Sequence, residues 1–496
     1  MPSMLVFVVL AFLLICCFSC LKPKNFPPGP KWLPLIGCVP VFYTLRKKSG
    51  FTHLALNELA QQYGPVVGLK LGKQRFIVVS SYDLVKKVLM RDEFNGRPSS
   101  FFFRVRSFGK EKGVLFTQGS VWQQQRRFTM RHFKVFGLGG EVMNQRLVSE
   151  AQSLVDFLEA SGKEGPVPMH TAFDIAVLNS LWTMLAGHRF EYDDHKLKEI
   201  LAVVHKVFKL TDTVGGIMSH MPFLRFVVPE LSGFNELMSN LQKLWGFIGS
   251  EIDEHETSLS KDQPRDLIDA FLMEIRAKGA GSQEDSIFDR ENLMILCLDL
   301  FLAGSKTTTD SLAALFSFLA LNPHWVKELQ QHMDAVIGRD RPPTLADMPL
   351  LPKIEAFIAE AQRFLHLAPL GIPHNTLKDT SLEGYLIPKD TTVLLNFYSA
   401  NSDKSQWENP EEFQPQRFLD EQGKFRQSTG AMAFSLGKRR CLGEGLARNS
   451  LFLFFTYVLQ HFDMKLAPGY EPPNLNGIDG FLISPTPYYL VLKPRH

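Results

Sequence analysis

The sequence predicts a mainly α-helical protein with small β-sheets, an α+β fold, preceded by one membrane-spanning helix. Three observations support this prediction. Segments with apolar residues at helical spacing fill most of the chain, short β-branched segments occur in three places, and an unbroken apolar stretch begins the sequence. Of the 496 residues, 45% are hydrophobic and 21% are charged, which excludes a disordered or low-complexity protein.

The N-terminal segment predicts a membrane anchor. Residues 1–21 contain no charged side chain, and about 20 apolar residues are needed to span a bilayer. A cleaved signal peptide is the alternative, but a charged start and a small-residue cleavage site are absent. We therefore expect a transmembrane anchor over 1–21. Lys22 and Lys24 follow, and basic residues favour the cytosolic side, so the rest of the chain is expected there.

A basic and proline-rich linker over 22–40 follows the anchor. Its Phe26-Pro27-Pro28-Gly29-Pro30 segment prevents a helix and predicts a stiff spacer. Residues 41–496 contain no internal repeat, low-complexity stretch or long linker, so we expect them to form one domain.

Within this domain, strands are expected where β-branched residues flank turn residues. Residues 65–71 and 74–80 meet at Gly72-Lys73 and predict a hairpin, and 385–387 with 391–395 have a similar pattern. Residues 481–483 with 488–492 are a third candidate pair. Apolar periodicity predicts helices over 121–135, 141–161, 170–186, 195–210, 234–259, 290–321, 323–337, 353–366 and 443–461.

Charge and cysteine content exclude two classes of protein. The chain has 54 basic and 51 acidic residues, a net charge of +3, which argues against a nucleic-acid partner. Six cysteines in a chain of this length are too few for a disulfide scaffold.

The predicted helix 290–321 is unusual. Leu293–Leu302 is apolar on every side except at Asp299, as in a helix buried in a protein core or a membrane. The polar residues Lys306–Asp310 in mid-helix argue against a membrane span. Gly304 costs about 1 kcal/mol of helix propensity, and Thr307 and Thr308 lie beside it. We expect this face to pack closely against another segment or to bind a ligand.

The segment Phe434–Gly443 carries the strongest chemical signal. Cys441 precedes an apolar helix, and the helix N-terminus together with Arg439 and Arg440 favours a thiolate. A lone thiolate in a buried pocket is typical of a haem-iron ligand. A zinc site would need further Cys or His residues nearby, and the sequence has none there.

These residues resemble a known signature. Phe434, Gly437, Arg439 and Cys441 match the F-x-x-G-x-R-x-C haem-binding motif of the cytochrome P450 superfamily. The resemblance covers roughly residues 26–493. It implies the P450 fold and haem b with the Cys441 thiolate as axial ligand.

Other motifs of the superfamily occur in the expected order. Glu360-Ala361-Gln362-Arg363 matches E-x-x-R, and Pro415-Gln416-Arg417-Phe418 matches P-x-R-F, which implies a Glu360–Arg363–Arg417 network. Trp122 and Arg126 match W-x-x-x-R. The resemblance implies that Trp122, Arg126, Arg97, His374 and Arg439 bind haem propionates.

Ala303, Gly304 and Thr307 match the oxygen-binding motif of this superfamily, with one departure. Thr307 stands at the threonine that helps to deliver protons, and Gly304 opens the oxygen groove. Lys306 replaces the usual acid, and an ammonium group cannot relay protons as a carboxylate does. Asp310 or water could replace the acid, or residue 306 could point away from the site.

The resemblance further implies a microsomal monooxygenase in the endoplasmic reticulum membrane. NADPH–cytochrome P450 reductase would supply electrons, and cytochrome b5 is a further candidate donor. We expect the reductase to dock on a basic face. This face comprises Arg126, Arg127, Arg131, Lys134, Lys438 and Arg440.

The expected substrate is a lipophilic small molecule, because the segments that line the family's pocket are strongly apolar here. Candidate pocket residues are Phe102, Phe103, Arg104, Phe116, Leu300, Leu370, Ile372 and Leu482. The phenylalanine-rich segment and residues 300–309 resemble insect microsomal enzymes of juvenile hormone biosynthesis, which epoxidise the terminal double bond of farnesoic acid or methyl farnesoate. Arg104 or Arg106 binding a carboxylate would favour the acid.

Three other functions remain open at this point. A steroid or xenobiotic hydroxylase would share every motif above. A haem-thiolate isomerase or dehydratase that needs no oxygen would agree with Lys306 but not with Thr307. A non-catalytic, membrane-tethered carrier of haem or lipid would not need Thr307, Glu360, Arg363 and Cys441 together.

Overall fold

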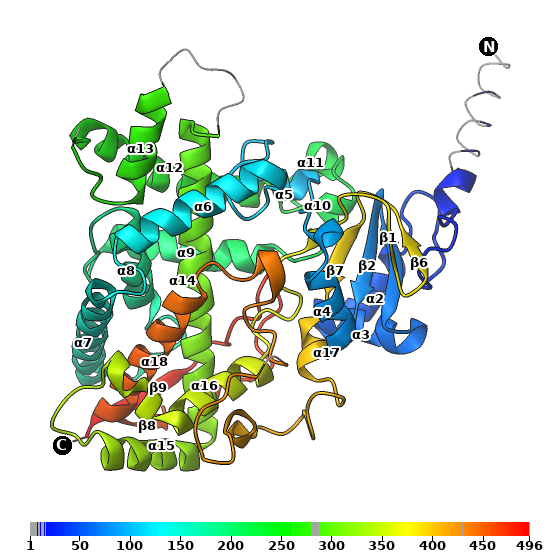
Figure 1. The fold of residues 1–496 in the computed structure, drawn as a ribbon. Coiled ribbons are helices and arrows are strands. Elements are labelled where there is room, and N and C mark those ends of the chain that lie inside the picture. Colours follow the sequence, from blue (N-terminus) through cyan, green and yellow to red (C-terminus); the bar gives the residue numbers. More distant parts are fainter. Residues whose placement is uncertain are drawn as a thin grey trace.

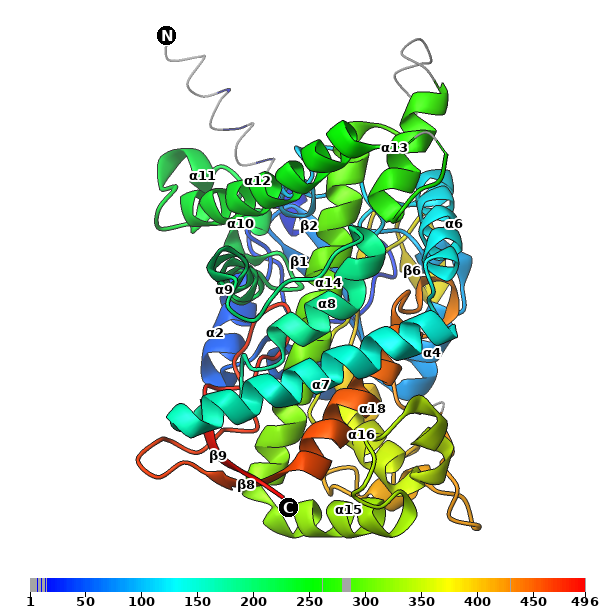
Figure 2. The ribbon, with the colours of Figure 1, turned by 90° about the vertical axis from the view of Figure 1, so that its left-hand side faces the viewer.

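The computed structural model describes residues 7, 10, 14, 16–260, 262–278, 287–428 and 430–495. Helices form one side of the molecule, and the largest sheet lies on the other side (Figure 1). Helix α14 (Arg290–Leu321) runs through the helical part in both views (Figures 1 and 2).

The other helices surround α14 or cover the sheet. They are α2 (Val39–Ser49), α3 (Thr52–Tyr63), α4 (Tyr82–Leu89), α5 (Phe101–Val105), α6 (Gly119–Val135), α7 (Glu141–Glu164), α8 (Asp174–Leu185), α9 (His195–Leu210), α10 (Gly216–His220), α11 (Leu224–Val227), α12 (Phe234–Ser258), α13 (Leu267–Lys278), α15 (Pro323–Val336), α16 (Pro352–Phe364), α17 (Phe397–Asn401) and α18 (Glu444–His461). Short 3-10 helices are η1 (Asp92–Phe94), η2 (Leu345–Leu350), η3 (Pro415–Phe418) and η4 (Gly437–Arg439).

The strands form three small sheets. They are β1 (Val66–Leu71), β2 (Gln74–Val79), β3 (Val167–Pro168), β4 (His374–Asn375), β5 (Thr380–Leu382), β6 (Tyr385–Ile387), β7 (Thr392–Leu395), β8 (Phe462–Leu466) and β9 (Tyr489–Pro494). Their orders are β1-β2-β7-β4, β3-β9-β8 and β5-β6.

Every predicted helix is present, and its ends differ from the prediction by at most four residues. The helices that were not predicted are α2, α3, α4, α5, α10, α11, α13 and α17. Among them α4 has only eight residues, which is too short for a helical period to stand out from the sequence. The long apolar patterns therefore located most helices around α14, but they missed α13 and the helices that cover the sheet.

Two of the three predicted strand pairs are wrong. The β1–β2 hairpin is correct, but β6 pairs with β5, and β7 pairs in parallel with β2 and antiparallel with β4. All four β7 residues are buried, which requires neighbours on both sides rather than a two-stranded hairpin. Residues 481–483 form no strand, because the N–H groups of Phe481 and Ile483 donate to Phe208 and Leu367.

The proline-rich segment lies on the sheet instead of forming a free spacer. The Gly68 N–H group donates to the Pro28 carbonyl at 2.7 Å, and Phe26 and Trp32 are buried. A side chain at Gly29 would collide with the Gly68 carbonyl, so glycine permits this close contact.

The predicted anchor over 1–21 lies largely outside the described residues, since residues 1–6, 8, 9, 11–13 and 15 are not described. In the described part of the chain, no helix combines the length and the apolar character that crossing a membrane requires.

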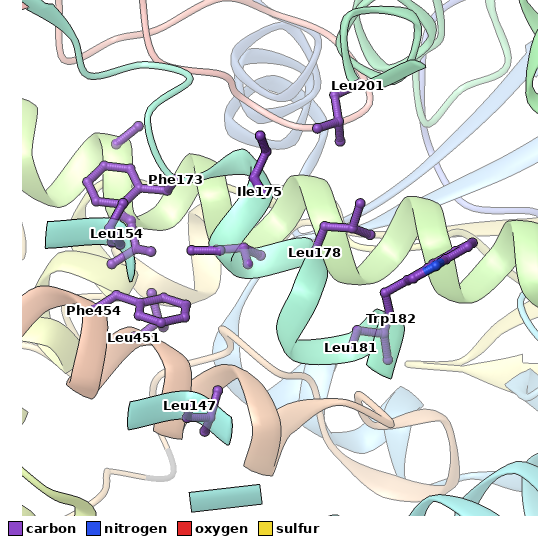
Figure 3. Close-up of a cluster of buried hydrophobic side chains, with 14 of the residues drawn as sticks. Leu147, Leu154, Phe173, Ile175, Leu178, Leu181, Trp182, Leu201, Leu451 and Phe454 are labelled. Carbon is purple, nitrogen blue, oxygen red and sulfur yellow. The ribbon is translucent and has the colours of Figure 1, made fainter. Parts of the chain in front are cut away.

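The largest hydrophobic core surrounds α14. Figure 3 shows Leu147 and Leu154 of α7, Phe173, Ile175, Leu178, Leu181 and Trp182 in and before α8, Leu201 of α9, and Leu451 and Phe454 of α18. Through these side chains α8 and α18 pack against α14, and α7 packs against α8 and α18, so the central helix is held from several sides. The predicted buried position of helix 290–321 is therefore correct.

Candidate active site

A cavity lies beside α14 and collects most of the predicted site residues. Those that line it are Phe102, Phe103 and Phe116, Arg97, Trp122 and Arg126, Leu300, Ala303, Gly304 and Thr307, Ile372 and His374, Phe434, Arg439 and Cys441, and Leu482. These residues come from α5, α6, α14 and β4, from the segments that precede α5, α6 and β4, and from the loops before α18 and β9. Segments far apart in the sequence thus meet at one site.

The loop before α18 presents Cys441 to this cavity. The Cys441 N–H group donates to the Phe434 carbonyl at 2.9 Å, which closes the loop, and the Arg448 guanidinium lies 4.8 Å from the centre of the Phe434 ring. Gly437 has a φ of +70°, and a side chain there would collide with the Leu89 carbonyl. Gly437 does not line the cavity, so its role is to let the loop pack against α4.

The groups around Cys441 shift the pKa of its free thiol in both directions. Burial raises its pKa, and Glu444 raises it further. The Gly443 N–H group and Arg126 act in the opposite direction but do not outweigh burial. Arg439, which we expected to favour the thiolate, instead points to Trp122, with its guanidinium 3.8 Å from the ring centre. A metal ion bound at Cys441 would favour its thiolate form.

Arg97 and Arg439 are buried cations at the cavity wall. Arg97 donates to the carbonyls of Leu115, Ile372 and Pro373, and Arg439 donates to those of Asn95 and Thr117. Within the described residues, neither guanidinium has a carboxylate partner. Burial lowers the pKa of Arg97 to about 9, and burial together with Arg97 and Arg126 lowers the pKa of Arg439 to about 8. Two adjacent cations without an anion form a site for a bound carboxylate.

The other predicted propionate partners lie nearby but differ in what they offer. The Arg126 guanidinium lies 6.0 Å from the Trp122 ring centre and donates to the Arg440 carbonyl at 3.1 Å. His374 Nδ1 lies 2.7 Å from the Phe94 carbonyl, to which it must donate. Burial and the neighbouring Arg97 and Arg439 hold the pKa of His374 well below its usual value. The neutral ring therefore offers an acceptor at Nε2, whereas the arginines offer donors.

The predicted oxygen-binding segment lies in the middle of α14. The Thr307 hydroxyl donates to the Ala303 carbonyl at 2.8 Å and keeps its lone pairs free for the cavity. A side chain at Gly304 would collide with Leu181 of α8, which Figure 3 shows beside α14. Gly304 lines the cavity, and it also permits the close packing of α14 and α8.

Lys306 points away from the cavity. Its ammonium group forms a buried ion pair with Asp310, one turn further along α14. The second Asp310 oxygen accepts a hydrogen bond from Ser484 at 2.9 Å. Neither Lys306 nor Asp310 lines the cavity, so the geometry gives no support to Asp310 as a substitute proton relay.

The predicted Glu360–Arg363–Arg417 network is assembled next to α16. Both Glu360 oxygens accept from Arg363 at 2.7 Å, and Arg417 Nε lies 3.4 Å from Glu360. Arg363 also donates to the carbonyls of Asn401 and Pro410. The network joins α16 to the segment before the cysteine loop, so it supports that loop without touching the cavity contents.

Two predicted pocket residues, Leu370 and Arg104, lie outside the cavity, whereas Arg106 lies in its wall. Leu370 is buried in the core on the sheet side and does not line the cavity. Arg104 also lies outside it and pairs with Glu111 at 2.5 Å. Arg106 does line the cavity, where it forms an ion pair with Asp299 of α14.

Three helices contribute a part of the cavity wall that the sequence did not predict. These residues are Val177 and Leu181 of α8, Val207 and Phe208 of α9, and Leu237 and Leu241 of α12. The apolar stripes of these helices predicted burial, but nothing in the stripes separates a core position from a cavity position.

Comparison with known families agrees with this geometry. The family model described as Cytochrome P450 matches residues 27–492. This chain is a cytochrome P450. It is 36% identical to the farnesoate epoxidase of Bombyx mori over 494 residues, with 99% of each chain covered. It is 35% identical to cytochrome P450 2B2 of Rattus norvegicus over 474 residues, with 94% of each covered, and 35% identical to cytochrome P450 2J1 of Oryctolagus cuniculus.

Cytochromes P450 are monooxygenases that use haem with a cysteine thiolate ligand and take electrons from a redox partner. The residues of this cytochrome P450 fit that cofactor. Cys441 would supply the thiolate, and Arg97 and Arg439 would supply cations for the haem carboxylates, because both line the cavity without a carboxylate partner among the described residues. Gly443 lines the cavity, and a side chain there would meet no atom within 4 Å, which leaves room for a flat ring.

Proposed function

We propose that this cytochrome P450 epoxidises the terminal double bond of a linear sesquiterpenoid, methyl farnesoate or farnesoic acid. The observation that carries the proposal is an aromatic wall in the cavity that also contains Cys441 and Thr307. Phe103 lies 5.0 Å from Phe116 and 5.2 Å from Phe102 between ring centres. A flexible isoprenoid gains free energy by burial against such rings. The similarity to a farnesoate epoxidase gives further support.

The electrostatics near Arg106 favour the ester over the acid. Asp299 is fully buried, pairs with Arg106, and accepts the N–H groups of Val114 at 2.7 Å and Leu115 at 2.9 Å. Burial lowers the pKa of Arg106 to about 10, so it stays charged at neutral pH. Since Asp299 already balances this cation, a substrate carboxylate would add an uncompensated buried charge. Methyl farnesoate avoids that cost.

The chain has separate roles for its own residues in the reaction. When bound to Cys441, the haem supplies the oxygen activation. The aromatic wall excludes water and orients the double bond, and Arg97 and Arg439 hold the propionates. Lys306 is held in an ion pair with Asp310 and does not line the cavity, so it is not placed to relay protons. Thr307 and Ser311 do line the cavity, and we propose that their hydroxyl groups pass protons from water.

We further propose attachment to the endoplasmic reticulum membrane and electron transfer from NADPH–cytochrome P450 reductase. Exposed cations near the cysteine loop support this partner, since an acidic surface would be attracted to them. They are Arg127, Arg131, Lys134, Lys438 and Arg440, and Arg126 lies beside them half-buried. Reversing the charge of Arg131 and Lys134 should slow the reductase-driven rate and flatten its salt dependence.

A turnover assay tests the substrate. Membranes that carry this protein and a reductase receive NADPH with methyl farnesoate, farnesoic acid, a steroid or an aryl ether. We expect a product of +16 mass from the sesquiterpenoids, more from the ester, and none from Cys441→Ser. Oxidation of the steroid or ether alone would refute the epoxidase proposal and leave a hydroxylase. A product of unchanged mass that forms without NADPH would identify an oxygen-independent isomerase.

A further inference from the structure

The residue that departs from the family motif belongs to a buried contact between α14 and a loop of the cavity wall. The side chains of Lys306 and Asp310 are 3% and 1% exposed. Such a pair is stable only when its remaining hydrogen-bonding positions are also satisfied. The Ser484 hydroxyl does this for Asp310, because it donates to the second carboxylate oxygen at 2.9 Å. The charge pair on α14 is thereby linked to a residue 174 positions further along the chain.

Ser484 closes the loop that carries two cavity residues. The Ile478 N–H group donates to the Ser484 carbonyl at 2.8 Å, and the Ser484 N–H group donates to the Ile478 carbonyl at 3.1 Å. Between these ends, Phe481 and Leu482 line the cavity. The position of their side chains therefore depends on where the base of the loop is fixed.

A second contact, here called the outer contact, holds the same loop at Asp479, and the contact through Ser484 is called the inner contact. The Asp479 carboxylate pairs with Arg46 at 2.9 Å and accepts from the Thr52 hydroxyl at 3.0 Å. This outer contact ties the loop to α2 and α3. The inner contact through Ser484 ties it to α14, which itself carries Leu300 and Thr307 into the cavity. The inner contact thus fixes two parts of the cavity wall relative to each other.

The identity of residue 306 matters for this contact. With the usual acid at 306, two carboxylates would lie one turn apart on a buried helix face, where like charges repel strongly. One of them would become protonated, and Asp310 would be a weaker acceptor for Ser484. Burial raises the pKa of Asp310, and the Lys306 ammonium group opposes this shift, so lysine favours the charged carboxylate that accepts from Ser484.

We propose that Lys306 is a positioning residue, which acts through Asp310 and Ser484 to fix Phe481 and Leu482 against α14 and thereby to orient the substrate. Lys306 itself does not line the cavity. This inference deepens the proposed function and depends on it only for the choice of substrate.

The first test measures the loop itself by hydrogen exchange in the haem-loaded, full-length protein. Ser484→Ala removes the hydroxyl without leaving an unpaired charge, and Ser484→Thr restores it. We expect amide exchange of Phe481 and Ile483 to become about tenfold faster in Ser484→Ala, the effect of losing one hydrogen bond to a charged group. Ser484→Thr should behave as the wild type. Ser317→Ala is the matched control, since that α14 hydroxyl donates to Ala314 in its own helix.

The second test reads substrate orientation from the products of methyl farnesoate. The wild type should form mainly the terminal epoxide. Ser484→Ala and the double variant Lys306→Met/Asp310→Leu should both form a mixture and raise KM, while the spectrum of the CO-bound haem stays unchanged. Unchanged exchange and an unchanged product ratio in both variants would overturn the inference. If the wild type does not oxidise methyl farnesoate, the proposed function fails, and the exchange rates still decide whether Ser484 fixes the loop.

Discussion

The protein buries arginines in two different ways. Arg363 has a carboxylate partner, since both Glu360 oxygens accept from its guanidinium and Arg417 lies beside them. Arg97 and Arg439 donate only to backbone carbonyls, and burial lowers the pKa of each. A buried cation that is paired with an anion stabilises the fold. A buried cation without an anion is an uncompensated charge, which an anionic ligand can neutralise. The difference separates structural from cofactor-binding arginines before any cofactor is considered.

The largest effect should come from breaking the paired cluster, which comprises Glu360, Arg363 and Arg417. Arg363→Met leaves the Glu360 carboxylate buried without its main partner, and the free energy of unfolding should fall by about 3–5 kcal/mol. Arg363→Lys should recover little, because one ammonium cannot replace two parallel hydrogen bonds. Urea unfolding measures both. The control is Lys163→Met, which removes an exposed pair with Glu159 and should cost less than about 0.5 kcal/mol. Equal losses in the two variants would contradict the comparison.

In the unpaired cluster, which comprises Arg97 and Arg439, a substitution should weaken haem retention rather than the stability of the haem-free chain. Arg439→Met removes a desolvated cation that repels Arg97, so the chain without haem should lose little stability. Haem retention should weaken, with loss to an acceptor protein about 10- to 100-fold faster, since a charge-assisted hydrogen bond disappears. The neighbouring Arg440 is exposed, and Arg440→Met should release haem at the wild-type rate. If Arg439→Met destabilised the haem-free chain as much as Arg363→Met does, the two classes of arginine would not differ.

Arg106 lines the cavity but, like Arg363, it has a carboxylate partner, Asp299. Asp299→Asn keeps an oxygen for the N–H groups of Val114 and Leu115 but removes the charge that balances Arg106. We expect kcat/KM for farnesoic acid relative to methyl farnesoate to rise about tenfold, because the freed cation can attract the carboxylate. Glu291→Gln removes an exposed charge from the same helix and should leave the ratio unchanged. A ratio that does not move in Asp299→Asn would refute the proposed basis of ester preference.

The sequence predicted those parts of the site that depend on local spacing. Glu360 and Arg363 share a helix face because they are three residues apart, and Trp122 and Arg126 do so at a spacing of four. The family motifs likewise located Cys441 and Thr307. Apolar periodicity predicted the helices around α14 because long stripes produce a strong signal.

Contacts between distant segments could not be predicted in the same way. The partner of Asp310 is Ser484, and no local pattern connects them. The sequence did not distinguish Arg104 from Arg106, because only tertiary packing turns one to Glu111 at the surface and the other to Asp299. The strand β7 was assigned the wrong neighbour for a similar reason, since its pairing with β2 lies outside its own segment.

The same difference between paired and unpaired buried charges applies to two acidic residues, Asp347 and Glu355, where the expected effect on stability is the smallest. Asp347 is paired, and the hydrogen bonds from Arg341 lower its pKa to about 2. Burial raises the pKa of Glu355 to about 7, and Arg448 only partly opposes this shift. Stability from Asp347 is therefore present above the unfolded pKa near 3.8 and is lost as the pH falls toward 2. The contribution of Glu355 has the opposite sign. It is present below the unfolded pKa near 4.5 and is lost as the pH rises to about 7, because the native state must then ionise a buried carboxyl.

Urea unfolding between pH 4.5 and 7 should separate the two acids. Relative to Glu355→Gln, the wild type should lose stability across this range, by an amount on the order of 1 kcal/mol because water still reaches the carboxyl in part. The difference between the wild type and Asp347→Asn should stay constant over the same range, because Asp347 is ionised in both states there. A pH-independent difference between the wild type and Glu355→Gln would mean that Glu355 has a partner, and that an acid in α16 can be balanced without the close pairing seen between Glu360 and Arg363.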